Sequence, residues 1–212
     1  MGKLYDSLLS GTSGRTGRIV VANVSGNEIS RVRPKKRSGQ PTVKQLLIQN
    51  RMKKCALFMQ SYRGYACKYF GTRMGMKSSY NLAMTNLMEN FKINYADATI
   101  TPDYPMLSFS KGTLLAPVPL ALNLATAGTL EVTWQDNAAG NTERENDFAQ
   151  ILVAIKDEDI SMFVENAAKR YDAAYTVSLP VNFQSKPLHI WIAFRTEDGE
   201  TASNSQYAGT VS

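Results

Sequence analysis

The densest group of chemically active side chains in this sequence is a basic run in the first fifth of the chain. Five cations fall within seven residues: Arg31, Arg33, Lys35, Lys36 and Arg37. Cations at this density can pair with phosphates by releasing bound counterions, without reading base sequence. The same run also fits an acidic protein surface, or a stretch that is simply solvated. We therefore take these five residues as the candidate contact site for a nucleic acid or an acidic partner.

A second basic stretch, between residues 62 and 77, alternates cations with aromatic rings. Its cations are Arg63, Lys68, Arg73 and Lys77, and its rings are Tyr62, Tyr65, Tyr69 and Phe70. Exposed rings beside cations are typical of surfaces that stack on unpaired bases. This stretch could therefore extend the candidate site.

Residues that commonly carry catalysis are scarce. His189 is the only histidine, which excludes a metal site built on a pair of histidines. It shares one face of an alternating segment with Trp191 and Ala193, which favours a structural role. Cys55 falls on the apolar side of a predicted helix and is expected in the core. We expect a protein that is not an enzyme, with no cofactor and no metal.

Two short motifs resemble ligand-binding loops without completing them. Asp157-Glu158-Asp159 lacks the spacing and the closing glutamate of a calcium loop, which favours a solvated turn. Gly14-Arg15-Thr16-Gly17 matches the G-x-x-G loop with which KH domains clamp a nucleic-acid backbone. That loop lies between two helices, whereas this motif precedes a predicted hairpin, so a simple glycine turn is favoured.

The charges are distributed unevenly along the chain. Residues 1–95 contain 17 Lys and Arg against 3 acids, whereas residues 96–212 contain 7 against 15. The net charge of +6 therefore hides a basic front half and an acidic back half. Such asymmetry predicts two regions with different partners. Basic and acidic surfaces on successive copies could also pair head to tail.

Composition narrows the class of protein. A hydrophobic content of 43% is enough for a packed core. No segment approaches 18 consecutive apolar residues, so we expect no membrane span. The first ten residues do not resemble a secretory signal, which predicts a protein of the cytoplasm or of a virion. Cys55 and Cys67 are expected as two reduced thiols rather than as a disulfide.

The hydrophobic period changes from helical to alternating along the chain. Residues 18–24 and 28–32 flank a turn and predict a β-hairpin. Helices are predicted from Thr42 to near Gly64 and from Ser78 to Phe91. Strands are predicted at 129–134, 148–156, 161–166, 175–179, 188–195 and 201–207.

The predicted fold class is α+β in two domains. A basic region of one β-hairpin and helices spans residues 1–100, and an acidic antiparallel β-sandwich spans residues 101–212. Short strands at this spacing are typical of immunoglobulin-like or fibronectin III-like sandwiches. Trp134 and Trp191 are candidate core residues of that sandwich.

Seven short segments spread over nearly the whole chain have a familiar pattern: Gly11–Gly17, Arg31–Lys35, Pro41–Gln45, Ser110–Gly112, Thr133–Asp136, Ser178–Pro180 and Ser203–Gly209. Through these segments the chain resembles a family of uncharacterised proteins from Bacteroidota and their phages. The resemblance implies a basic N-terminal region and a fibronectin-like C-terminal domain. It implies no catalytic residue, since the family has no assigned activity. Where that family usually has an aromatic residue after the hairpin turn, this chain has Glu28 and Ile29.

Two functional hypotheses follow. The leading one is a non-enzymatic structural or assembly protein acting in multiple copies, such as a phage virion component, which associates with itself or with other structural proteins. The alternative is a nucleic-acid-associated protein that binds the phosphate backbone through its basic N-terminal region. A hydrolytic enzyme that uses His189 is a distant third.

Overall fold

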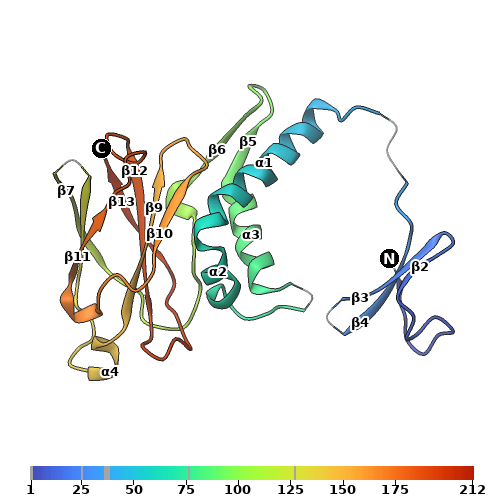
Figure 1. The fold of residues 1–212 in the computed structure, drawn as a ribbon, viewed down its shortest axis with the longest axis horizontal. Helices are drawn as coiled ribbons and strands as arrows, with labels where there is room; N and C mark the ends of the chain where they lie inside the picture. The colour runs from blue at the N-terminus through green and yellow to red at the C-terminus, as the bar shows by residue number, and fades with distance from the viewer. Residues whose placement is uncertain (1, 25, 36–38, 76, 127) are drawn as a thin grey trace. The chain divides into compact units, whose positions relative to one another are not determined.

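The computed structural model describes residues 2–24, 26–35, 39–75, 77–126 and 128–212. The chain divides into two compact units. The N-terminal unit comprises Met1–Thr42 with Met74–Met76, and the main unit comprises Val43–Arg73 with Lys77–Ser212. The fold is mixed α+β: an antiparallel sheet, then helices, then several antiparallel sheets (Figure 1).

The N-terminal unit is a four-stranded antiparallel sheet in the order β1-β4-β3-β2. Its strands are β1 (Gly2–Lys3), β2 (Gly14–Thr16), β3 (Ile19–Val24) and β4 (Asn27–Val32). Strands β3 and β4 are the hairpin predicted from the sequence, paired from Ile19↔Val32 to Val24↔Asn27. Among the described side chains of this unit only Val21 and Ile29 are buried, so the sheet has a very small core.

The main unit begins with a long helical segment. Helix α1 (Val43–Met59), the 3₁₀ turn η1 (Gln60–Tyr62) and helix α2 (Arg63–Tyr69) follow one another without a break. The sequence predicted an end near Gly64, and this was wrong. Buried side chains of α2, including Tyr65 and Tyr69, pack into the core. This packing outweighs the roughly 1 kcal/mol that one glycine costs inside a helix.

Helix α3 (Ser79–Asn90) confirms the second predicted helix. Ser78 caps it, because its side-chain oxygen accepts a hydrogen bond from the N–H of Asn81. The predicted apolar stripe faces the core, with Ala83, Met84 and Leu87 buried. The helix therefore follows the sequence pattern closely.

The strands of the main unit form three antiparallel sheets. They are β5 (Phe91–Asn94), β6 (Thr99–Pro102), β7 (Pro119–Thr126), β8 (Thr129–Trp134), β9 (Phe148–Ile155), β10 (Ser161–Val164), β11 (Ala174–Ser178), β12 (Leu188–Arg195) and β13 (Gln206–Val211). The sheet orders are β10-β9-β12-β13, β11-β8-β7 and β5-β6. Short helical turns lie between strands: η2 (Tyr104–Met106), α4 (Thr142–Glu145) and η3 (Arg170–Asp172).

Most predicted strands are present, with one clear shift. Strands β8 and β12 have the predicted bounds, and β9, β10 and β11 differ only at their ends. The last strand begins at Gln206 rather than Thr201. The preceding residues are held elsewhere: Ser203 accepts a hydrogen bond from the N–H of Phe194, and its carbonyl accepts one from the Ser110 hydroxyl.

The four-stranded sheet of the main unit is buried on both faces. In β9, Leu152 and Ala154 pack with the helices, whereas Ile151 and Val153 pack with the three-stranded sheet. Strand β12 alternates in the same way. Figure 1 shows α2 and α3 on one side of β9 and β10, and β7 and β11 on the other. Two-sided burial explains why these two strands read as nearly continuous apolar runs.

A buried ion pair links the ends of the two packed sheets. Arg170 Nη2 lies 2.7 Å from Asp147 Oδ2, and neither side chain is more than 2% exposed. Asn137 Oδ1 accepts a second hydrogen bond from this guanidinium at 2.6 Å, and the ring of Phe194 lies 4.0 Å from it. The guanidinium is therefore paired, hydrogen-bonded and stacked, as a buried charge requires.

Gly112 lies where two backbone segments approach closely. A Cβ atom at this position would be 2.0 Å from the carbonyl oxygen of Ala202. The Gly112 N–H donates to Asn204 Oδ1, and the N–H of Leu114 donates to that same Ala202 carbonyl. Only glycine fits here without moving the backbone.

Candidate functional site

The register of the N-terminal sheet collects basic side chains on one face. Arg15 and Arg31 both lie opposite Val20, one from each neighbouring strand, and Lys3 lies opposite Ile29. Directly opposed residues share a face, and so do residues two apart on one strand. Lys3, Arg15 and Arg31 therefore share one face, which we call the basic face.

Two further arginines lie at one end of this face. The N–H of Arg33 donates to the carbonyl of Arg18 at 2.8 Å, which extends the pairing of β3 and β4 by one step. Arg33 is two residues beyond Arg31 and so continues its alternation. Arg18 lies in the two-residue turn between β2 and β3. The end of the sheet therefore adds two cations beside the basic face.

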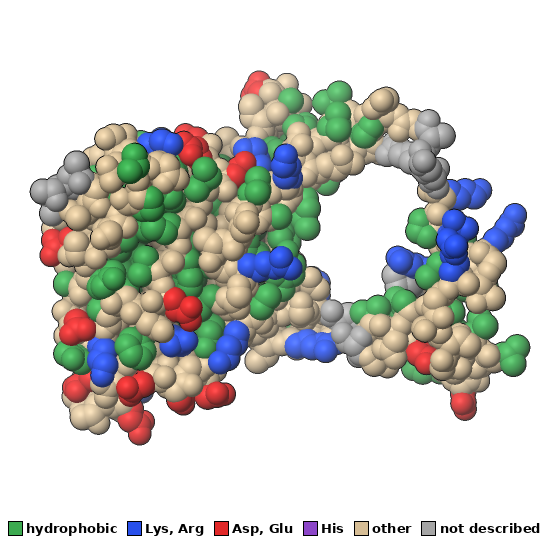
Figure 2. All heavy atoms as spheres, viewed as in Figure 1, with side chains coloured by type: hydrophobic (Ala, Val, Ile, Leu, Met, Phe, Trp, Pro, Cys, Tyr) green, Lys and Arg blue, Asp and Glu red, His purple; other side chains and the backbone are tan. Residues whose placement is uncertain are grey.

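The six described cations of the N-terminal unit are exposed and form no ion pair with a described residue. Lys3, Arg15, Arg18, Arg31, Arg33 and Lys35 are all exposed. Within the described part of the chain, none of them forms an ion pair. Figure 2 shows Lys and Arg side chains gathered over one part of this unit, apart from its acidic side chains. Their charge is therefore available to a partner.

The structure places three of the five predicted contact residues. Arg31, Arg33 and Lys35 are exposed, whereas Lys36 and Arg37 lie outside the described residues. Lys3, Arg15 and Arg18 join them, although the sequence analysis did not single them out. The signal was available in Gly17-Arg18, because a two-residue turn that begins with glycine before a β-branched run is typical of a tight hairpin.

The G-x-x-G motif of this unit is part of the sheet. Gly14–Thr16 is strand β2, and Gly17 begins the turn that follows, with a φ of 58°. A KH loop joins two helices, so the favoured glycine turn is confirmed and the KH alternative is wrong. The positive φ at Gly17 explains why glycine stands there.

The opposite face of the same sheet, which we call the apolar face for its exposed Ile19 and Val32, is weakly covered and also carries Thr16, Asn23, Glu28 and Ser30. Ile19 and Val32 lie opposite each other there, 40% and 75% exposed, beside the buried Val21. Glu28, one of the two acids of Met1–Thr42, also belongs to this face, where its carboxylate accepts from the N–H of Gly11. The sheet thus separates a basic face from an apolar one.

The charges are divided differently between the two compact units than between the two halves of the sequence. Met1–Thr42 contains 8 Lys and Arg and 2 acids, whereas the main unit contains 16 of each. The whole net charge of +6 is therefore carried by the N-terminal unit. Composition changes near residue 95, but packing changes at Thr42, because the basic helices share a core with the acidic strands.

Some of the charge in the main unit is compensated internally. Lys54 of α1 binds both carboxylate oxygens of Asp159 at 3.0 Å. Lys68 of α2 donates to the carbonyl of Gly199, and Asp198 has a pKa below its usual value. Hydrogen bonds from Thr196 and Glu200 are the main cause of that lowered pKa, and the charge of Lys68 adds to it. Basic helices and acidic loops thus meet within one copy.

The aromatic residues of the second basic stretch do not extend the site. Tyr62, Tyr65, Tyr69 and Phe70 are all buried, at 1% to 7% exposure. They pack against Phe109 and Phe163 in the core beneath the helices. Rings in these positions cannot stack on bases, so that part of the sequence prediction was wrong.

His189 is held between aromatic rings. Its imidazole stacks on the Tyr104 ring at 3.6 Å, and Nδ1 lies 2.7 Å from Tyr207 Oη. Burial, together with a smaller contribution from the charge of Lys156, lowers its pKa to about 4. Nε2 is buried without a hydrogen-bond partner in the described chain. This environment keeps the ring neutral.

Both cysteines are free, as predicted. Cys55 is fully buried in the core, and burial raises the pKa of its thiol to about 12. A thiol with so high a pKa is a poor nucleophile at neutral pH. Cys67 is exposed.

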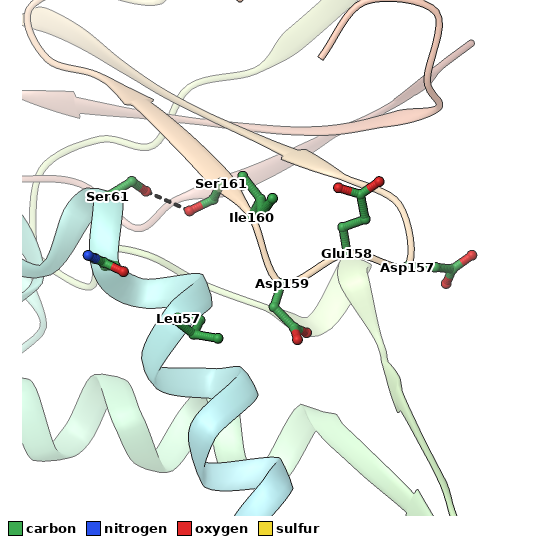
Figure 3. A pocket seen from close by; sticks show the side chains of 8 residues that line it. Leu57, Ser61, Asp157, Glu158, Asp159, Ile160 and Ser161 are labelled. Carbon is green, nitrogen blue, oxygen red and sulfur yellow. Dashed lines mark hydrogen bonds between the residues drawn. The ribbon is translucent and has the colours of Figure 1, made fainter. Parts of the chain in front are cut away.

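The acidic turn after β9 lines a pocket whose carboxylates diverge. A pocket of about 610 Å³ is lined by Leu57, Gln60, Ser61 and Asp157–Ser161. Figure 3 shows the carboxylates of Asp157, Glu158 and Asp159 pointing in three directions. Asp159 pairs with Lys54, and Glu158 pairs with Lys186 at 2.7 Å. The turn is held by lysines rather than arranged around one centre.

The described residues offer neither a cluster of metal ligands nor a membrane-spanning helix. No three His, Cys, Asp or Glu side chains there come together in a way that could hold a metal ion. None of the helices in the described ranges is long and apolar enough to cross a membrane.

Comparison with known proteins gives one family and no function. Residues 11–209 match the model of a family of unknown function, DUF6266. No curated protein matches the chain. Since the match covers nearly all of the sequence, the chain belongs to this family.

Proposed function

We propose that this chain is a non-enzymatic protein that binds the phosphate backbone of a nucleic acid through its basic face. The observation that carries the proposal is the sheet register, which places Lys3, Arg15 and Arg31 together with no neutralising acid. The N-terminal unit also holds the whole net charge of the chain. Pairing these cations with phosphates releases condensed counterions, which drives binding.

A direct test measures the affinity for a labelled nucleic acid as a function of salt. If about six cations contact phosphate, raising the salt from about 50 to about 200 mM should weaken binding about a thousandfold. The triple variant Arg15→Gln/Arg31→Gln/Arg33→Gln should bind at least about tenfold more weakly and lower the salt slope by about 3.

The matched control removes charge from the main unit. Lys156→Gln/Lys186→Gln changes two exposed or half-exposed lysines far along the chain from the basic face. It should leave the affinity and the salt slope nearly unchanged. Absence of binding at low salt, or an equal loss in the control, would overturn the proposal.

The state of the nucleophilic and acid–base groups supports a non-enzymatic role. His189 is stacked, hydrogen-bonded and held neutral, and Cys55 is buried with a raised pKa. Asp159 pairs with Lys54, and Glu158 pairs with Lys186. These side chains take part in the packing, hydrogen bonds and ion pairs that stabilise the fold.

The strand order supports a fibronectin III-like arrangement for the main unit. The first, second and fifth of its last seven strands form the three-stranded sheet, β11-β8-β7. The other four form the sheet β10-β9-β12-β13, and the inner faces of the two sheets share one hydrophobic cluster. We propose that these strands are an immunoglobulin/fibronectin III-like β-sandwich backed by helices, a scaffold that commonly presents binding surfaces. A solved structure whose two sheets do not face each other would rule this out.

A structural or assembly role in multiple copies, as in a phage virion, is the second candidate. The apolar face of the N-terminal sheet favours it, because Ile19 and Val32 gain free energy when another protein or copy covers them. Light scattering should then show concentration-dependent association that Val32→Asp abolishes. A monomer at high concentration, with and without that change, would remove this candidate.

A further inference from the structure

We infer that the basic face binds double-stranded rather than single-stranded nucleic acid, by contacting the two phosphate rows that flank one groove. This inference rests on the proposed function and names the class of ligand for that same face. It follows from the spacing of the cations across the sheet and from the absence of rings beside them.

The cations lie on separate strands. Arg15 on β2 and Arg31 on β4 both oppose Val20 of β3. Neighbouring strands are about 4.8 Å apart, so the Cα atoms of these two arginines are about 10 Å apart. Along β4, Arg31 and Arg33 are separated by about 7 Å. The face therefore presents positive charge on both sides of the uncharged strand β3, with Arg15 on one side and Arg31 and Arg33 on the other, and we call these its two rows of cations.

A duplex offers two phosphate rows at a matching separation. The major groove is about 12 Å wide and the minor groove about 6 Å wide, and arginine side chains are long enough to close the difference. A single strand offers one row, which can occupy only one of the two rows of cations. Both rows are neutralised together only by a duplex.

The face also lacks what single-strand binding uses. Proteins that bind single strands stack bases on aromatic side chains, at about 1–3 kcal/mol per base. The sequence of Met1–Thr42 contains one aromatic residue, Tyr5, which lies outside the strands. The uncharged residues on the basic face are Val20, Ala22, Val24, Asn27 and Ile29, which offer no ring.

The test compares a labelled duplex with one of its own strands, using the full chain. Salt slopes are about −0.9 per contact for a duplex and about −0.7 for a single strand, so the slopes would differ by about 1 even if the single strand made the same six contacts. The duplex should therefore bind about tenfold more tightly at about 0.1 M salt. Arg15→Gln and Arg31→Gln should each lower the duplex slope by about 1, because each removes one row's contact.

Further variants separate the possible outcomes. Arg15→Lys/Arg31→Lys keeps both charges and should retain duplex binding, and Tyr5→Ala should change neither affinity. Equal or tighter binding of the single strand would overturn this inference and leave the proposed function standing. A loss of single-strand binding in Tyr5→Ala would likewise show that stacking is used. Binding of neither ligand at low salt would overturn both, as would tight binding only to an acidic protein such as poly-glutamate.

Discussion

In the N-terminal unit only Val21 and Ile29 are buried among the described side chains, and all six described cations are exposed. In the main unit two clusters of buried residues cover both faces of a sheet, and cations equal acids in number. Most of the buried apolar surface therefore lies in the main unit, and the uncompensated positive charge lies in the N-terminal unit. Proteins are only marginally stable, so the main unit supplies most of the stability. Changes that weaken one property should therefore leave the other intact.

The largest test of this contrast is removal of a central ring. Trp191 is 1% exposed and packs against Phe58 and Tyr207, so Trp191→Ala should lower the free energy of unfolding of the main unit by about 3–5 kcal/mol. Urea denaturation followed by circular dichroism measures this. The matched change Val21→Ala should leave the midpoint of that transition in place. An equal shift from both would show that the two units unfold as one.

Removing one member of the buried ion pair should have a comparable or slightly smaller effect. Arg170→Met leaves the Asp147 carboxylate buried and unpaired, which should cost about 3–5 kcal/mol of stability. Arg170→Met/Asp147→Leu removes both charges and should recover most of that loss. Affinity for nucleic acid at low salt should stay the same in the double variant. If the double variant were no more stable than the single one, the pair's charge would not be the cause.

Acidification should destabilise the main unit through its single histidine. The pKa of His189 is about 4 in the folded chain and about 6.5 in the unfolded chain, so the unfolded state binds more protons between these values. The contribution of His189 to stability should therefore fall by roughly 3 kcal/mol as the pH drops from about 6.5 to about 4, and this contribution should change little below about pH 4.

Two measurements check the histidine prediction. The imidazole NMR signal belongs to one residue and should titrate near pH 4 in the folded protein. His189→Phe keeps a ring against Tyr104 and should flatten the pH dependence of stability in this window. A folded-state midpoint near pH 6.5 would contradict the burial of this side chain.

The smallest predicted effect compares two glycines of the main unit. Gly112→Ala forces a Cβ against the Ala202 carbonyl and should cost about 1–3 kcal/mol. Gly64→Ala adds a methyl group in open space inside α2 and should stabilise by about 0.5–1 kcal/mol. Thermal unfolding measures both. The same sign for the two changes would show that close backbone approach does not explain Gly112.

The local sequence pattern was sufficient to predict an element where the period of its apolar residues alone determined the structure. The alternation of Thr129–Trp134 and the helical stripe of Ser79–Asn90 follow from the period of their apolar residues. The local sequence pattern failed to predict an element where tertiary contacts determined the backbone conformation. Gly64 continues a helix because its neighbours are buried, and β7 begins at Pro119, a residue that usually argues against a strand.

The sequence predicted the basic segment Arg31–Lys35, but it did not predict which other residues share a face with it in the folded sheet. Arg31–Lys35 stands out because its cations are adjacent in sequence. Arg15 joins Arg31 only through the register of β2, β3 and β4, which a linear count of charges does not contain. The apparent division into a basic and an acidic half failed for the same reason, since the helices after Thr42 fold onto the acidic strands.

Two-sided burial of β9 and β12 also sets an order of events during protein synthesis. Strand β9 ends at Ile155, and β12, its central partner, ends at Arg195. At 5–20 residues per second the ribosome takes about 2–8 s to make the intervening 40 residues. Throughout that interval an apolar β-strand has helices for one face and no β12 at its edge. Until β12 is available, β9 is therefore an apolar strand with an unpaired edge, which is the kind of segment that is prone to aggregate.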